Sequence, residues 1–331
     1  MAPVHVSLLL GLAVASLGAC ANDSAESPTP PVTPTPTSTT TPTTDCSGLS
    51  TGITNTTLTA GGATHDVRIY VPPVPTGTGV LPVVLNWHAN GANGEQQAGY
   101  TEYEALAEQK GFIVVHPTGT RLDGVPVLEQ GTGWELVDGL ESPAVDDLAF
   151  ANALIDELIA NWCADASYIF SIGMSNGGLF TSAMVCELAD RLAGAGSVAG
   201  LYHPESCEPS RAVPYIAFAG ITDPVVPFET AGETVYPELR ENVLALGSFD
   251  AFAAFATQFG CDAEPTVTEF SQDVTRYDYL NCEDGVPMTL YAFEANNGHS
   301  WPGAPSDQST TDEIDATLES WHFFESIVTR P

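Results

Sequence analysis

The chain has 331 residues, 44% of them hydrophobic, so it is long enough to bury one large core. Its 42 acidic residues outnumber its 8 basic residues and give a formal charge of −34 at pH 7. A surface this acidic repels nucleic acid, anionic lipid and polyanionic substrates, which excludes them as partners held by charge.

Residues 1–19 are predicted to be a lipoprotein-type signal peptide. Their apolar segment, Val6–Leu17, is short for a membrane span and is followed by small residues. Leu17-Gly18-Ala19-Cys20 resembles the bacterial lipobox, in which the cysteine is lipidated. Because no Lys or Arg precedes this segment, ordinary cleavage and release is the alternative. We therefore expect a bacterial cell-surface lipoprotein or a secreted protein, whose only membrane attachment would be the N-terminal lipid.

Residues 20–45 are predicted to form a disordered, extended linker. They are mostly Pro, Thr and Ser, with repeated Thr-Pro pairs, and cannot bury apolar surface. The folded domain is expected to comprise residues 46–331.

Six cysteines beyond Cys20 are expected to form disulfides. They are Cys46, Cys163, Cys186, Cys207, Cys261 and Cys282. An even set without C-x-x-C spacing argues against zinc and favours three disulfides in an oxidising compartment. The sequence does not determine the pairing; our hypothesis joins Cys261 to Cys282, Cys186 to Cys207, and Cys46 to Cys163.

Strands and helices are predicted to alternate along the folded part. Strands are expected at 65–71, 81–87, 111–116, 195–199, 213–219 and 287–293, and helices at 99–109, 148–162, 248–259 and 312–327. This alternation predicts an α/β fold with a mostly parallel central sheet flanked by helices on both faces.

The stretch 168–188 carries the candidate nucleophile. An apolar run of strand length leads into Gly173-Met174-Ser175-Asn176-Gly177, and apolar residues then recur at helical spacing. Strand, G-x-S-x-G and helix together predict a nucleophile elbow, a sharp turn that exposes a serine above the end of a parallel sheet. The two glycines are expected because a side chain at either would collide with the facing strand or helix.

A serine nucleophile needs a base to accept its proton and an acid to orient that base. In α/β-hydrolases these residues follow in the order Ser, Asp or Glu, His, each on a loop after a strand. Asp223 and His299 occupy such loops. The only other histidine beyond Asp223 is His322, which falls inside the last predicted helix. Asp223 and His299 are therefore predicted to be the acid and the base for Ser175.

The oxyanion of the tetrahedral intermediate needs two preorganised donors. One is expected to be the backbone N–H of Asn176, directly after the nucleophile. The second is expected from the turn after the strand 81–87, through Ala89 or Asn90.

Trp134 and Trp301 are candidate walls of a substrate pocket, with core packing as the alternative for Trp134. His88 is a further candidate for this pocket, although a structural role in its turn fits it better. His65, His116 and His203 are interpreted as structural or exposed.

Several motifs resemble one family of secreted serine esterases, which contains polyhydroxybutyrate depolymerases, feruloyl esterases and acetylxylan esterases. The motifs are Asn86-Trp87-His88, Gly131-Thr132-Gly133-Trp134, Val145-Asp146-Asp147, Gly173-Met174-Ser175-Asn176-Gly177-Gly178, Asp223-Pro224-Val225-Val226-Pro227 and Gly298-His299-Ser300-Trp301-Pro302-Gly303. The resemblance spans about residues 50–328. It implies the α/β-hydrolase fold, Ser175, Asp223 and His299 as catalytic triad, and hydrolysis of carboxylic esters.

One position departs from the family pattern, which usually has His-Gly where this chain has His88-Ala89. If that residue needs a positive φ or a close approach of substrate, alanine would distort the oxyanion hole and lower activity.

The sequence thus predicts an extracellular serine esterase that works through an acyl-enzyme as a monomer, without metal or cofactor. Feruloyl or acetyl esters of plant polysaccharide and polyhydroxybutyrate, all polymer-linked, fit the triad equally, and the sequence does not choose among them. Two alternatives stay open. One is a serine peptidase on the same fold, and the other is a non-catalytic surface binding protein derived from a hydrolase, which the substitution at Ala89 would favour.

Overall fold

The computed structural model describes residues 46, 48–73, 79–121, 131–136, 145–239, 243–296, 298–307 and 309–329. These residues belong to one compact unit. The predicted signal peptide, Cys20 and the predicted linker lie outside the described residues. Within the described ranges, none of the helices has the length and apolarity needed to cross a membrane.

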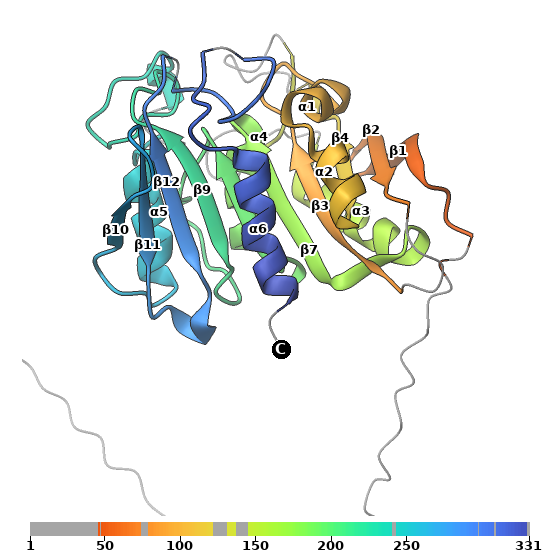
Figure 1. Ribbon diagram of the computed structural model, residues 1–331. Coiled ribbons are helices and arrows are strands. Elements are labelled where there is room, and N and C mark those ends of the chain that lie inside the picture. The colour runs from red at the N-terminus through yellow and green to blue at the C-terminus, as the bar shows by residue number, and fades with distance from the viewer. Residues whose placement is uncertain are drawn as a thin grey trace, which may run out of the picture. The chain divides into compact units, whose positions relative to one another are not determined.

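A ten-stranded mixed sheet forms the centre of the unit (Figure 1). Its strands, in spatial order, are β1 (Gly52–Ala60), β2 (Ala63–Val71), β4 (Ile113–Pro117), β3 (Leu81–Trp87), β7 (Ala164–Met174), β8 (Gly194–Val198), β9 (Tyr215–Gly220), β12 (Met288–Phe293), β11 (Val274–Tyr279) and β10 (Thr266–Glu269). The strands from β4 to β12 pair in parallel, and the two strands at each edge pair antiparallel. The short strands β5 (Thr120–Arg121) and β6 (Thr132–Gly133) form a separate pair.

Helices cover both faces of the sheet (Figure 1). They are α1 (Gly94–Thr101), α2 (Tyr103–Lys110), α3 (Asp147–Asn161), α4 (Asn176–Glu187), α5 (Ser248–Gln258) and α6 (Ala316–Val328). One buried cluster packs α3, α4 and α5 against one face, and a second packs α2 and α6 against the other. Along β3 the side chains alternate between the clusters, because Val83 and Leu85 join the first and Val84 joins the second. The sheet is therefore buried on both sides, as parallel strands require.

Most of the predicted elements agree with the structure, and the main differences are these. The helix expected at 99–109 is two helices, α1 and α2, because Glu102 between them has φ +53 and interrupts the helical backbone. The edge strands β1, β10 and β11 were not predicted, because their polar side chains hide the strand pattern. The last helix begins at Ala316 rather than at residue 312, because Asp315 caps it by accepting a hydrogen bond from Leu318 N at 3.0 Å.

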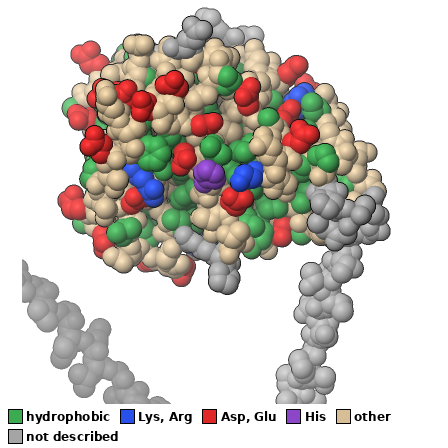
Figure 2. All heavy atoms as spheres, in the orientation of Figure 1, with side chains coloured by type: hydrophobic (Ala, Val, Ile, Leu, Met, Phe, Trp, Pro, Cys, Tyr) green, Lys and Arg blue, Asp and Glu red, His purple; other side chains and the backbone are tan. Residues whose placement is uncertain are grey.

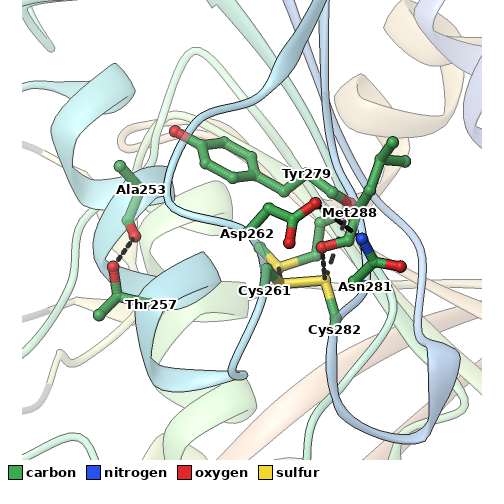
Figure 3. Close-up of a disulfide and its surroundings, with 9 residues drawn as sticks. Ala253, Thr257, Cys261, Asp262, Tyr279, Asn281, Cys282 and Met288 are labelled. Carbon is green, nitrogen blue, oxygen red and sulfur yellow. Dashed lines mark hydrogen bonds between the residues drawn. A yellow bond between two sulfur atoms is a disulfide. The ribbon is translucent and has the colours of Figure 1, made fainter.

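Three disulfides have the pairing that was proposed from the sequence: Cys46–Cys163, Cys186–Cys207 and Cys261–Cys282. Figure 3 shows the last of these, which joins the end of α5 to the turn between β11 and β12. Asn281 Nδ2 donates to Asp262 Oδ2 at 2.7 Å beside it. Three disulfides are typical of a protein folded outside the reducing cytoplasm.

Acidic side chains are spread over the face shown in Figure 2, and basic ones are few. Several of the basic side chains are paired with acids, as in Arg68–Glu104 at 2.7 Å and Arg276–Asp278 at 2.8 Å. The exposed surface therefore keeps the negative character that the composition predicts.

Candidate active site

Four parallel strands deliver the candidate residues to one edge of the sheet. The turn at residues 88–92 follows β3, Ser175 follows β7, Asp223 follows β9, and His299 follows β12. Because parallel strands end at the same edge, residues more than 200 positions apart in the sequence meet there.

Ser175 lies on the predicted elbow between β7 and α4, with a strained backbone of φ +52 and ψ −120. The two flanking glycines make this turn possible. A Cβ at Gly173 would lie 2.4 Å from the backbone of Gly177, and a Cβ at Gly177 would lie 2.3 Å from Trp87 O on β3. The strand, the helix and β3 therefore touch backbone to backbone, which fixes the position of Ser175.

His299 connects Ser175 to Asp223. Its Nε2 lies 2.9 Å from Ser175 Oγ, and its Nδ1 lies 2.9 and 3.1 Å from the two oxygens of Asp223. An ionised carboxylate only accepts hydrogen bonds, so Nδ1 carries the hydrogen and Nε2 can accept the serine proton. Asp223 Oδ1 also accepts from the backbone N–H of Val225 and of Val226, at 2.7 and 2.9 Å. These bonds hold the carboxylate in a fixed orientation toward the imidazole.

A cavity of about 290 Å³ opens beside Ser175 and His299. It is mostly apolar and is lined by Ala89, Asn90, Met174, Ser175, Asn176, Leu179, Val225, Val226, Tyr236, Leu239, Leu244 and His299. A small apolar chamber with a nucleophile and base at one side can receive the apolar part of a substrate and bring its reacting carbon to the serine.

The strand order, the strained serine between strand and helix, and the chain order Ser, Asp, His identify the architecture. This is the α/β-hydrolase fold. An acetyl xylan esterase from Aspergillus awamori has it too, with a TM-score of 0.56 and 16% identity, and the match covers 83% of this chain and 99% of that one. A thermostable esterase matches with a TM-score of 0.53 over 83% of this chain and 62% of its own.

Sequence relatives of the chain are named as esterases, although no family profile matches it. Feruloyl esterase B of Piromyces equi is 26% identical over 71% of this chain and 42% of its own length. Feruloyl esterase C of Emericella nidulans is 25% identical over 81% of this chain and 87% of its own length. The chain thus spans less than half of the Piromyces protein and most of the Emericella protein. It is a relative of carboxylic ester hydrolases.

The turn after β3 is fixed by His88, which is fully buried. Gly119 N donates to His88 Nε2 at 2.8 Å, so Nδ1 carries the hydrogen and donates to Ala89 O at 2.7 Å. Burial lowers the pKa of His88 to about 4, which keeps this neutral form at physiological pH. The Ala89–Asn90 peptide is trans, so the Asn90 N–H points away from the carbonyl that His88 holds.

The substitution at Ala89 causes no backbone strain. Among described residues other than glycine, Ala89 is not one of those with positive φ. Ala89 lies on the wall of the cavity. The distortion considered from the sequence, a required positive φ, therefore does not occur in this turn.

Trp134, Trp301 and His88, the candidates for substrate binding, lie away from the cavity. All three are buried at 1% exposure or less and none lines the cavity. Trp301 packs on the α2 and α6 side of the sheet and donates its indole N–H to Thr317 Oγ1 at 3.0 Å. This contact anchors the loop that carries His299.

The far wall of the cavity was missed from the sequence. Val225, Val226, Tyr236, Leu239 and Leu244 all come from the segment between Asp223 and α5. The available signal was a series of apolar residues in a long segment without a predicted strand or helix. Of the other histidines, His65 and His116 are buried, and His203 Nε2 lies 3.0 Å from Gln258 Oε1.

Proposed function

We propose that this protein is a serine esterase in which Ser175 is the nucleophile, His299 the general base and Asp223 the orienting acid. The observation that carries the proposal is the continuous set of hydrogen bonds from Ser175 Oγ through the imidazole to Asp223. Relatives named as feruloyl esterases support ester hydrolysis as the reaction. The geometry also supports an enzyme over the binding-protein alternative, because a binding site alone does not need this alignment.

The reaction proceeds through two tetrahedral intermediates. His299 Nε2 accepts the proton of Ser175 as Oγ attacks the ester carbonyl carbon. The intermediate collapses, the carbon–oxygen bond to the alcohol breaks, and the imidazolium returns its proton to the leaving alkoxide. Water then loses a proton to His299 and attacks the acyl-enzyme, which releases the acid and restores Ser175.

The oxyanion is stabilised by two backbone donors. Asn176 N–H is in the first turn of α4, where N–H groups have no acceptor within the helix. The helix dipole adds partial positive charge at the same end. The second donor comes from the 88–92 turn, through the backbone N–H of Ala89 or Asn90, both of which line the cavity.

The cavity favours an acyl group larger than acetyl. Its volume of about 290 Å³ is near the lower limit of pockets that hold drug-sized molecules, and an acetyl group would leave most of it empty. Its walls are apolar with one phenol, from Tyr236, which suits an aromatic acyl group. We therefore propose hydroxycinnamoyl esters, of the feruloyl type and linked to polysaccharide, as the preferred substrates, cleaved by a monomer.

We also propose that the enzyme is tethered at a bacterial surface through a lipid on Cys20. In support, the six cysteines from Cys46 onward pair with one another and leave Cys20 for another role. Radiolabelled palmitate supplied to expressing cells should enter the wild type and not Cys20→Ala; equal labelling would refute the anchor.

The experiment that tests the function compares hydrolysis of methyl ferulate, p-nitrophenyl butyrate and p-nitrophenyl acetate by the purified protein and by Ser175→Ala. We expect kcat to fall by at least about 10³-fold in the variant, because nucleophile and base act as a unit. We expect kcat/KM to be highest for methyl ferulate. Unchanged turnover in a folded Ser175→Ala protein would overturn the proposed mechanism, and a preference for acetate would overturn the acyl-group assignment.

A further inference from the structure

The Gly131–Trp134 segment forms hydrogen bonds with Asn176, the residue that follows the nucleophile. Trp134 N donates to Asn176 Oδ1 at 2.7 Å, and Asn176 Nδ2 donates to Trp134 O at 3.0 Å. Both polar atoms of the Asn176 side-chain amide are thus bonded to the backbone of Trp134. Asn176 is 3% exposed, so water does not compete for either bond.

The same segment also forms hydrogen bonds with the turn after β3. Gly91 N donates to Thr132 O at 2.8 Å, and the hydroxyl of Thr132 donates to Ala92 O. The indole N–H of Trp134 donates to His88 O at 3.0 Å. These three bonds fasten the 88–92 turn at its beginning, middle and end.

Both glycines of the segment allow this close approach. A Cβ at Gly131 would lie 2.4 Å from Gly91 Cα. A Cβ at Gly133 would lie 3.0 Å from Asn176 Oδ1 and 3.4 Å from Asn90 Oδ1. Any larger residue at Gly131 would push the segment away from the turn, and one at Gly133 would press on both asparagine side chains.

We propose that the Gly131–Trp134 segment is a clamp that sets the distance and direction between the two oxyanion donors, with the Asn176 side chain as its key positioning residue. This inference rests on the proposed esterase function. The two donors belong to chain segments about 85 residues apart in sequence, which contact each other at Gly177 against Trp87 O and His88 O. The Gly131–Trp134 segment is bonded to both and keeps the oxyanion hole formed before substrate binds.

The clamp acts on the transition state more than on substrate binding. Preorganised donors stabilise charge that develops only as the carbonyl becomes tetrahedral, and one such donor contributes about 10²–10³-fold in kcat. Loosening the clamp displaces the donors without removing them. We therefore expect a smaller loss, about 10–100-fold in kcat, with KM changed by less than about 3-fold.

The test uses Asn176→Ala, which removes both bonds to Trp134, and Asn176→Asp, which keeps an acceptor for Trp134 N and loses the donor to Trp134 O. Trp134→Phe removes only the bond to His88 O and keeps an aromatic ring in the core. Each variant is assayed for kcat and KM and for inhibition by phenylboronic acid, which forms a tetrahedral adduct on the serine. Asn161→Ala is the matched control, because Asn161 is exposed and its amide bonds Glu157 at 2.8 Å on α3.

We expect Asn176→Ala to lose boronate affinity and kcat/KM by the same factor. Asn176→Asp should lose at least as much, because its buried carboxylate would face Trp134 O and the developing oxyanion. Trp134→Phe should lose less, and Asn161→Ala nothing. In the double variant of Asn176 and Trp134 the losses should be less than multiplicative, because both changes loosen one clamp. The clamp is refuted if a folded Asn176→Ala protein keeps kcat within 2-fold. It is also refuted if boronate affinity is unchanged while kcat falls, since the hole would then be intact. Loss of turnover in Ser175→Ala beside an unaffected Asn176→Ala would reject the clamp and leave the esterase standing.

Discussion

The parallel centre of the sheet and its antiparallel edges are stabilised by different interactions. In the centre, β3, β7 and α4 touch backbone to backbone at glycines, and every candidate catalytic loop leaves a central strand. At the far edge, β10 is exposed on both faces, and the extension that carries it is tied to α5 by the Cys261–Cys282 disulfide. The centre therefore depends on steric fit and the edge on a covalent link.

This difference predicts how each region responds to change. Close backbone contact cannot relax around an added atom, because interiors are packed as densely as crystals. A disulfide acts mainly on the unfolded chain, so its removal lowers stability while leaving the folded shape as it was. Substitutions in the centre should thus damage fold and activity together, and substitutions at the edge should separate them.

The largest effect is expected from Gly177→Ala. The new Cβ would lie 2.3 Å from Trp87 O and 2.7 Å from His88 O, both backbone atoms that cannot move aside. We expect a loss well above about 3 kcal/mol in unfolding free energy and no measurable turnover. Chemical denaturation followed by circular dichroism measures the first, and hydrolysis of p-nitrophenyl butyrate the second.

Gly99→Ala is the matched control. Gly99 lies in α1 and has no atom within 4 Å of its Cβ position. Alanine there should stabilise the protein by about 0.5–1 kcal/mol through helix propensity. Similar stabilities of the two variants would show that the centre is not set by steric fit.

The sequence predicted the centre well and the edges poorly, for one physical reason. Strands β3, β4, β9 and β12 are buried on both faces, so they are continuous apolar runs that can be recognised without a partner. Strand β1 reads Gly-Ile-Thr-Asn-Thr-Thr-Leu-Thr-Ala and β10 is exposed throughout. Their strand conformation comes from pairing with β2 and β11, which a local pattern does not report.

The residues of the candidate site also divide into those that the sequence could predict and those that it could not. Chain order and strand ends were enough to propose Ser175, Asp223 and His299, because the fold places such loops at one edge. The orientation of Trp134 and Trp301 was not predictable, since a motif does not say whether a ring faces the cavity or the core. Nor was the amide of Asn176, whose partner Trp134 lies 42 residues earlier and meets it only in the folded chain.

The second-largest effect is expected at the edge of the sheet, when Cys261 and Cys282 are both replaced by serine. The disulfide closes a loop of 21 residues. Its loss should cost about 3 kcal/mol in unfolding free energy, while kcat and KM of the folded enzyme stay within about 2-fold. Guanidinium unfolding curves and steady-state kinetics on the same preparation test both parts. A fall in kcat as large as that for Gly177→Ala would remove the distinction between edge and centre.

The smallest effect concerns a buried carboxylate, Asp147, at the start of α3 and beside His65 of the edge strand β2. Its side chain is fully buried, and its Oδ2 accepts from Glu135 N at 2.7 Å. Its Oδ1 has no hydrogen-bond partner among the described residues and lies 3.7 Å from the Nε2 of His65, whose own pKa burial lowers. Burial, with smaller contributions from the charges of Glu135 and Asp146, raises the pKa of Asp147 to about 7.

The sign of the resulting pH dependence follows from this raised pKa. Between the unfolded value near 4 and the folded value near 7, the native state binds a proton that the unfolded state has lost, so stability falls as pH rises through this range. Asp147→Asn keeps an acceptor for Glu135 N and cannot ionise. We expect its melting temperature relative to wild type to rise between pH 5 and pH 8, by an amount equivalent to about 2 kcal/mol. A difference that stays constant across that range would show that Asp147 is already ionised in the folded protein, and that its buried surroundings tolerate a charge.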